Sequence, residues 1–139
     1  MELKEQKFGI EIEMTGITRA KAAEVTAEYF GTRVKYLGTY YDTYAAIDTE
    51  GRQWKFMSDS SIHTERKVNG SRVNADVEYQ TEMVSPICRY EDIVTIQEII
   101  RKLKENGALT NKSCGIHVHI NAEPFDARTL RNITNIMAS

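Results

Sequence analysis

The chain has 139 residues, of which 41% are hydrophobic and 27% are charged, and this length and composition suit one globular domain with its own core. Its formal net charge of −2 at pH 7 gives no general attraction to nucleic acid or to an anionic membrane, so neither is expected as a partner. No apolar run approaches the roughly 18–20 residues that span a bilayer, the N-terminus is charged, and two cysteines make no disulfide framework. A cytoplasmic protein with reduced thiols is therefore expected.

The first predicted element is a strand over residues 7–14, because apolar and acidic side chains alternate there. This alternation places Glu11 and Glu13 on one face and the apolar side chains on the other. A helix is predicted over residues 19–30, with Thr18 as its N-cap and Gly31 as its C-terminal stop.

The middle of the chain is rich in β-branched and aromatic residues, which favours several short antiparallel strands. The predicted strands cover residues 33–37, 44–48, 52–57, 62–67 and 76–84. Turns separate them, and most of these contain glycine, including an Asn-Gly pair at positions 69–70. A second helix is predicted over residues 90–106, where an apolar stripe has helical spacing and basic residues fill the last turn.

A further strand within residues 113–121 carries two of the three histidines. Period-two alternation places His117 and His119 on one face, with Cβ atoms roughly 6.5–7 Å apart, close enough to serve one site. A last amphipathic helix is predicted from about residue 126, and the sequence stops inside it without a capping signal. We therefore expect the chain to be part of a longer protein.

The order of these elements predicts an α+β domain spanning residues 1–139, with an antiparallel or mixed sheet and helices on one face. No internal repeat or linker divides the sequence. The other face of the sheet would then carry the polar side chains of the strands.

Three predicted strands bring acidic or imidazole groups to that face: Glu11 and Glu13 on one, Glu82 on another, and His117 and His119 on a third. Such groups together form the mixed oxygen and nitrogen ligand set that Mg²⁺ or Mn²⁺ accepts. A Glu-x-Glu strand could reach two ions about 3.5–4 Å apart. Each pattern alone also fits a solvated sheet face, and the sequence does not show that the three strands are neighbours.

Other polar residues have simpler interpretations. Asp59 follows an aromatic strand and fits an Asx-turn. Cys88 and Cys114 have no CxxC partner, so they are interpreted as packing residues, and His63 as an isolated exposed side chain. No P-loop and no GxGxxG motif is present.

Four tyrosines lie close together in the sequence at positions 36, 40, 41 and 44. The pair Tyr40 and Tyr41 could form a stacking surface for a base, or it could belong to the core and its edge. The sequence leaves both interpretations open.

Four segments, in this order and spacing, resemble the amidoligase family, a branch of the glutamine synthetase-like carboxylate–amine ligases. The segments are Phe8 to Glu13, Trp54 to Ile62, Thr81 to Pro86 and Cys114 to His119. The resemblance implies the curved antiparallel sheet of the glutamine synthetase catalytic domain. It also implies ATP-dependent joining of a carboxylate to an amine, each from a small molecule or a peptide, through an acyl phosphate with Mg²⁺ or Mn²⁺.

The same resemblance assigns site residues by position. The implied metal ligands are Glu11, Glu13, Glu82 and His117. His119 would contact the transferred phosphate or the carboxylate substrate, and Asp59 occupies a motif position that we group with the catalytic residues. Ser60 stands where the family often has glycine. The family's later arginines and last metal-binding glutamate have no counterpart before Ser139. The chain is therefore expected to be either the N-terminal part of a longer ligase or a shortened homologue, and its 139 residues to hold only part of the site.

Two rival functions remain open at this level. A different metal-dependent enzyme, such as a hydrolase or phosphodiesterase, could use the same Glu/His cluster without ATP. A non-catalytic binding or structural module could carry the same polar strand face as a solvated surface.

Overall fold

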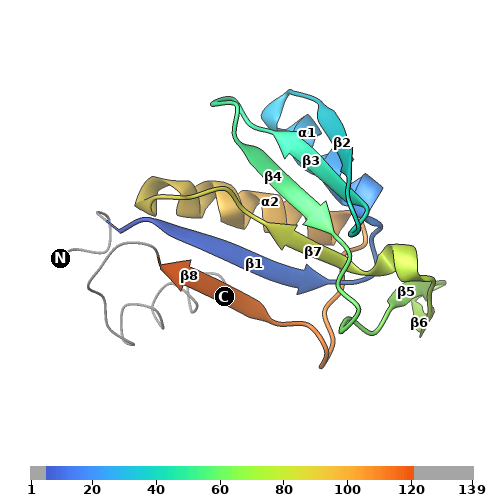
Figure 1. The fold of residues 1–139 in the computed structure, drawn as a ribbon. Coiled ribbons are helices and arrows are strands. Elements are labelled where there is room, and N and C mark those ends of the chain that lie inside the picture. Colours follow the sequence, from blue (N-terminus) through green and yellow to red (C-terminus); the bar gives the residue numbers. More distant parts are fainter. Residues whose placement is uncertain (1–5, 121–139) are drawn as a thin grey trace.

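The computed structural model describes residues 6–120, which form an α+β fold built on one six-stranded antiparallel sheet (Figure 1). The strand order is β2-β3-β4-β7-β1-β8. Its strands are β1 (Phe8–Met14), β2 (Val34–Gly38), β3 (Thr43–Ile47), β4 (Gln53–Met57), β7 (Thr81–Val84) and β8 (Ile116–Ile120). Strands β5 (Glu65–Val68) and β6 (Ser71–Asn74) form a separate hairpin. The predicted α+β class is thus confirmed.

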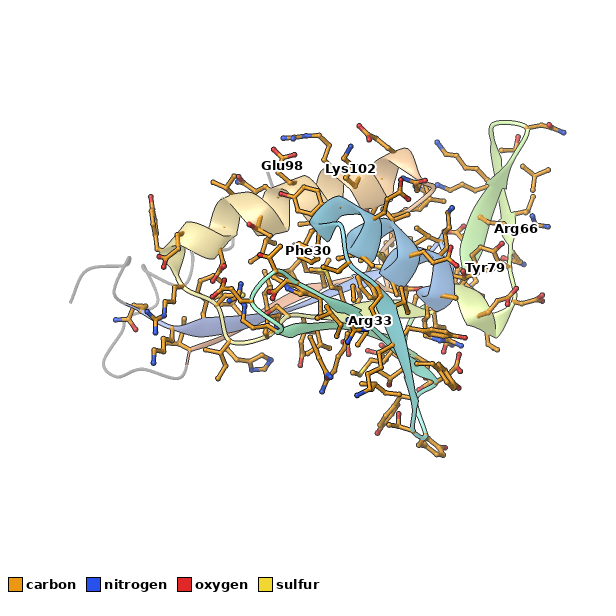
Figure 2. The ribbon with its side chains drawn as sticks, turned by 90° about the horizontal axis from the view of Figure 1, so that it is seen from above. Phe30, Arg33, Arg66, Tyr79, Glu98 and Lys102 are labelled. Carbon is orange, nitrogen blue, oxygen red and sulfur yellow. The ribbon has the colours of Figure 1, made fainter. Side chains whose placement is uncertain are left out.

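Two α-helices, α1 (Arg19–Phe30) and α2 (Ile93–Glu105), lie on the same face of the sheet (Figure 2). Short 3-10 helices occupy Val77–Tyr79 and Tyr90–Asp92, the second leading directly into α2. No helix in the described part of the chain is long and apolar enough to cross a membrane.

The core lies between this sheet face and the two helices. Alternate residues of β1, β4 and β7 point into it, and small or aliphatic residues of the helices meet them. The most buried of these side chains are Phe8, Ile10, Trp54, Phe56 and Met83 from the strands, and Ala22, Ala23, Ile96, Ile99 and Leu103 from the helices. Burial of this apolar surface, at roughly 25 cal/mol per Å², is the main stabilising contribution to the fold.

The ends of α1 follow the predicted capping signals. The Thr18 hydroxyl accepts a hydrogen bond from the Lys21 N–H at 3.2 Å, and Gly31 adopts φ = 72° at the C-terminal cap. Left-handed backbone of this kind suits glycine. Strand β1 and helix α1 therefore confirm the predictions for residues 7–14 and 19–30.

A buried ionic network ties the β3–β4 hairpin to the start of α2. Asp48 is 5% exposed and accepts hydrogen bonds from Trp54 Nε1 at 2.9 Å and from Arg52 Nε at 2.8 Å. Arg52 also contacts the Asp92 carboxylate at 3.0 Å. Burial acts to raise the pKa of Asp48, but these hydrogen bonds and the Arg52 charge lower it overall.

The prediction of one strand over residues 76–84 is wrong in its first half. Residues 77–79 form a 3-10 helix, and β7 begins only at Thr81. The buried Arg19 guanidinium explains the difference, because it donates to the carbonyls of Val77 at 3.0 Å and Gln80 at 2.7 Å. Those carbonyls are therefore not free to join a strand ladder.

The strand predicted over residues 62–67 begins later, at Glu65, and pairs with β6 instead of joining the main sheet. The Asn-Gly turn between the two strands is confirmed, since Asn69 and Gly70 both have positive φ. Thr15 anchors the hairpin: its hydroxyl donates to the Glu65 carbonyl at 3.0 Å and accepts from the Glu65 N–H at 2.9 Å. The helix predicted from about residue 126 lies outside the described residues.

Candidate functional site

The sheet register brings three strands with acidic or imidazole groups side by side. β1 lies between β7 and β8, with Glu13 opposite Glu82 and Glu11 opposite His117. Directly opposed residues share a face, with Cβ atoms about 4.5–5.5 Å apart. This face, turned away from α1 and α2, is called the polar face below.

Three carboxylates converge on the polar face. One oxygen atom from each of Glu13, Asp59 and Glu82 lies within 4.8 Å of the other two, and these residues are called the carboxylate cluster below. Glu13 is only 7% exposed, while Asp59 and Glu82 are half-buried. The cluster therefore concentrates negative charge where water can screen it only in part.

Asp59 reaches the cluster because of a tight turn after β4. Its Oδ1 accepts hydrogen bonds from the Ser61 N–H at 2.9 Å and the Ser61 hydroxyl at 2.7 Å, as in the predicted Asx-turn. Met57, the last residue of β4, pairs with Glu82, so the turn begins beside β7. Asp59 is thus both the Asx-turn residue that the sequence predicted and a neighbour of the other two carboxylates.

Burial and mutual repulsion change the acidity of the cluster. Burial, followed by the charges of Glu11, Asp59 and Glu13, raises the pKa of Glu82 to about 7. Burial and a hydrogen bond with Asp59 also raise the pKa of Glu13. For Asp59, hydrogen bonds from Ser61 outweigh the effect of burial and lower the pKa. The Glu82 carboxyl, with its pKa of about 7, therefore titrates near neutral pH.

The segment before β8 fixes one of these carboxylates. The Gly115 N–H donates to Glu13 Oε1 at 2.8 Å, and the Glu13 N–H donates to the Gly115 carbonyl at 3.0 Å. A Cβ atom at position 115 would lie 3.5 Å from Glu13 Oε1 and 4.0 Å from the His117 imidazole. Glycine therefore leaves the space between these two side chains open.

Asn111 holds this segment in place from the other side. Its Nδ2 donates to Glu65 Oε1 at 2.8 Å and to the His63 carbonyl at 3.0 Å, and its Oδ1 accepts from the Ser113 N–H at 3.0 Å. Neither Gly115 nor Asn111 could be recognised from the sequence as part of this site. Gly115 contacts a residue 102 positions away, and Asn111 contacts residues 46 and 48 positions away.

Glu11 and the two histidines form a second group beside the cluster. Glu11 Oε1 lies 3.4 Å from His119 Nε2 and 3.9 Å from His117 Nδ1. Both imidazoles are mostly exposed, at 58% for His117 and 64% for His119. The six predicted site residues therefore lie on one face but divide into two groups, with Asp59 grouped with Glu13 and Glu82.

The cysteines and the third histidine lie in other environments. Cys88 is fully buried and burial raises its pKa to about 11, so it is an uncharged packing residue at neutral pH. Cys114 is half-buried next to Gly115, and His63 is exposed. These positions agree with the interpretations made from the sequence.

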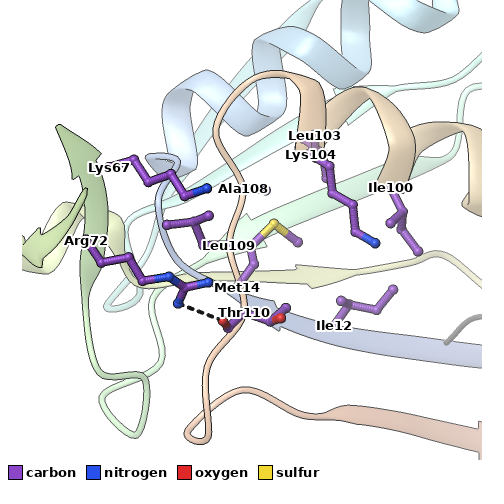
Figure 3. A pocket seen from close by; sticks show the side chains of 10 residues that line it. All are labelled: Ile12, Met14, Lys67, Arg72, Ile100, Leu103, Lys104, Ala108, Leu109 and Thr110. Carbon is purple, nitrogen blue, oxygen red and sulfur yellow. Dashed lines mark hydrogen bonds between the residues drawn. The ribbon is translucent and has the colours of Figure 1, made fainter. Parts of the chain in front are cut away.

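A pocket on the helix side of the sheet has a different character (Figure 3). It has a volume of about 340 Å³ and lies between α2, β1 and the β5–β6 hairpin, with Met14, Leu103 and Leu109 among its apolar lining residues. Lys67 and Arg72 also line it, and it contains no carboxylate and no imidazole. The polar face is therefore the better candidate for chemistry.

Comparison with known proteins gives one match. The model of a family described as "putative amidoligase enzyme" matches residues 4–139, which is nearly the whole chain. No curated protein and no solved structure matches the chain significantly. The family resemblance inferred from the four sequence segments is thus confirmed, while the wider relation to glutamine synthetase-like ligases rests on those segments alone.

Proposed function

We propose a function on the premise that the chain belongs to the amidoligase family, whose model it matches over nearly its whole length. The protein joins a carboxylate to an amine at the expense of ATP. ATP phosphorylates the carboxylate, and the amine then displaces phosphate from the acyl phosphate to form an amide. The carboxylate and the amine each belong to a small molecule or a peptide.

One observation supports this proposal above the others: the carboxylate cluster and the Glu11–histidine group lie side by side on the polar face. Phosphoryl transfer needs cation sites that neutralise the phosphates and positioned groups that hold the acceptor. An antiparallel sheet with helices on one face is also in keeping with the glutamine synthetase-like catalytic domain that the resemblance implies.

The carboxylate cluster fits a hard divalent cation. Oxygen ligands about 2.1 Å from a Mg²⁺ ion lie roughly 3–4.2 Å from one another, so oxygens within 4.8 Å can close around one ion with little movement. Burial, together with the negative charges nearby, raises the pKa of Glu13 and of Glu82, and a bound cation would favour the charged form of both carboxylates. A bound Mg²⁺ or Mn²⁺ would supply charge neutralisation for the phosphates of ATP.

The remaining groups have distinct roles in this proposal. Glu11 and His117 would hold a second cation beside the cluster. His119, the more exposed imidazole, would contact the transferred phosphate or the carboxylate substrate. Gly115 orients Glu13 through its N–H and fixes one oxygen of the cluster.

The test is ATP turnover by the full-length protein with Mn²⁺ and mixtures of carboxylates and amines. We expect ADP release to require Mn²⁺ and both substrates, and to fall at least about 100-fold in Glu13→Gln and in His117→Ala. Glu98→Gln on α2, on the helix side of the sheet (Figure 2), is the matched control and should retain wild-type turnover.

Three results would contradict the proposal. Undiminished turnover in both site variants would remove these residues from the reaction. Metal-dependent hydrolysis of a phosphodiester or peptide without ATP would favour another metal-dependent enzyme. Calorimetry that detects no Mn²⁺ binding would favour a non-catalytic module.

A further inference from the structure

The turn between β2 and β3 displays two tyrosines to solvent. Tyr40 is 94% exposed and Tyr41 is 52% exposed. Their ring centroids lie 5.4 Å apart in an edge-to-face arrangement. Exposed aromatic side chains that adjoin each other often mark a binding surface, because a planar partner can bury them.

This turn is built to hold one conformation. Gly38, Thr39 and Asp42 all have positive φ, which is uncommon for the two non-glycine residues. The Asp42 carboxylate accepts from Arg19 Nη2 at 2.9 Å and from the Tyr36 hydroxyl at 2.7 Å. The side chain of Arg19 is only 8% exposed, so a buried guanidinium group fixes Asp42 and with it the turn. The two tyrosines are therefore presented on a fixed support.

The turn also lies next to the carboxylate cluster. The Tyr41 carbonyl accepts a hydrogen bond from the Ser58 N–H at 2.9 Å, and Ser58 directly precedes Asp59. From the spacing of adjacent strands and of consecutive residues, the Tyr41 and Asp59 backbones lie within roughly 9 Å of each other. Figure 2 shows the β2–β3 hairpin, which begins near the labelled Arg33, extending away from the helices toward the side of the polar face.

We propose that the Tyr40 ring, which packs edge to face with Tyr41, is a stacking platform for the base of the nucleotide. This inference rests on the proposed function, in which the phosphates of ATP bind through cations at the carboxylate cluster. A nucleoside triphosphate carries its planar base at the end opposite the γ-phosphate, so a ring surface beside the phosphate site can hold that base. Stacking on aromatic side chains depends on the π-face that every base offers.

The side chains around the platform predict little discrimination between bases. Asp42 is engaged by Arg19 and Tyr36, and the Thr39 hydroxyl is engaged by Thr43 at 3.0 Å. The turn therefore offers mainly ring faces, and few groups that could read the edge of a base. ATP and GTP should bind with similar affinity.

The experiment measures the affinity of the protein for ATP, GTP and inorganic tripolyphosphate by calorimetry in excess Mn²⁺. Tyr40→Ala should weaken ATP and GTP binding roughly ten-fold to a hundred-fold and leave tripolyphosphate binding unchanged. Tyr40→Phe should bind ATP like the wild type, because it keeps the ring. Tyr90→Ala, which removes another exposed tyrosine beside α2, is the matched control and should change nothing.

The outcomes separate the platform from the proposed function. If the wild type binds neither ATP nor tripolyphosphate, both proposals are overturned. If it binds the two with equal affinity, or if Tyr40→Ala binds ATP normally, the platform is wrong and the proposed function stands. Equal weakening of ATP and tripolyphosphate in Tyr40→Ala would also overturn the platform, since the loss would then concern the phosphate site.

Discussion

The two faces of the central sheet are made by the same strands, but they differ in the kind of side chain that they bury. On the helix face, Ile12 and Phe56 are buried among apolar neighbours. On the polar face, Glu13 is buried to a similar degree beside Glu82, a residue of the same charge. One face stabilises the fold, while the other brings together groups that repel each other when no cation is present.

This contrast indicates where stability and function are located. Substitutions on the helix face should lower the free energy of unfolding and leave the ligand affinity of the folded protein unchanged. Substitutions in the carboxylate cluster should abolish cation binding and raise the stability of the metal-free protein, as expected where function requires an unfavourable local arrangement. The predictions below test these opposite signs.

The largest effect is expected from Phe56→Ala on the helix face. The Phe56 side chain is fully buried, so its removal leaves a cavity and should lower the free energy of unfolding by about 3–5 kcal/mol. Urea unfolding with and without Mn²⁺ measures this loss. A loss below about 1 kcal/mol, or a changed Mn²⁺ affinity in the folded variant, would contradict the division between the faces.

Cation binding should produce the next largest effect. A free Mn²⁺ concentration of 100 times the dissociation constant should stabilise the wild type by about 2.7 kcal/mol. Glu13→Ala removes a ligand and should show no such stabilisation, and chelation of Mn²⁺ should return the wild type to its metal-free midpoint. If Mn²⁺ stabilises the wild type and Glu13→Ala equally, the cation binds outside the carboxylate cluster.

The stability of the metal-free protein should depend on pH through Glu82. Its folded-state pKa of about 7 lies above its usual 4.5, so folding favours the protonated form. The resulting stabilisation is complete below about pH 4.5 and is lost as the pH rises through 7. Because Glu82 is partly screened by water, we expect a loss of only about 1–2 kcal/mol.

The control for this dependence is Glu82→Gln, which cannot ionise. Urea midpoints between pH 4.5 and 8 should fall in the wild type and fall less in this variant, in which Glu13 keeps a raised pKa. At pH 8 the variant should be the more stable protein. If wild-type stability instead rises with pH across this range, the repulsion assigned to the cluster is absent.

The smallest effect on stability is expected at the exposed end of the polar face. His119→Gln should change the free energy of unfolding by less than about 0.5 kcal/mol, because the imidazole is 64% exposed and its contact with Glu11 lies at the surface. The same substitution should lower ligase turnover by an order of magnitude or more, if His119 contacts phosphate or carboxylate. Assays of turnover and of unfolding on one sample distinguish these effects.

The sequence predicted the elements whose signals are local. Strand β1 and helix α1 were found because alternation, the Thr18 cap and Gly31 act within a few residues. The first half of the strand predicted over residues 76–84 was wrong because Arg19, far away in the chain, binds the carbonyls of that segment. A contact between residues this far apart in the chain cannot be predicted from the local sequence pattern.

The site shows the same limit. Alternation correctly placed Glu11 with Glu13, and His117 with His119, on one face of each strand. That Glu13 lies opposite Glu82 depends on the strand order β7-β1-β8, which is a property of the whole sheet. The approach of Asp59 to Glu13 depends in turn on the conformation of the segment after β4. The family motifs pointed to these residues, but only the fold shows their grouping.

The buried indole of Trp54 has a practical consequence for such experiments. Trp54 is the only tryptophan in the chain, it is fully buried, and its ring centroid lies 5.8 Å from that of Phe30 on α1. Its fluorescence should therefore shift to longer wavelength when the core opens to water. Since it faces the helices, a ligand on the polar face should leave that emission almost unchanged. The protein thus carries an intrinsic optical probe that reports unfolding separately from ligand occupancy.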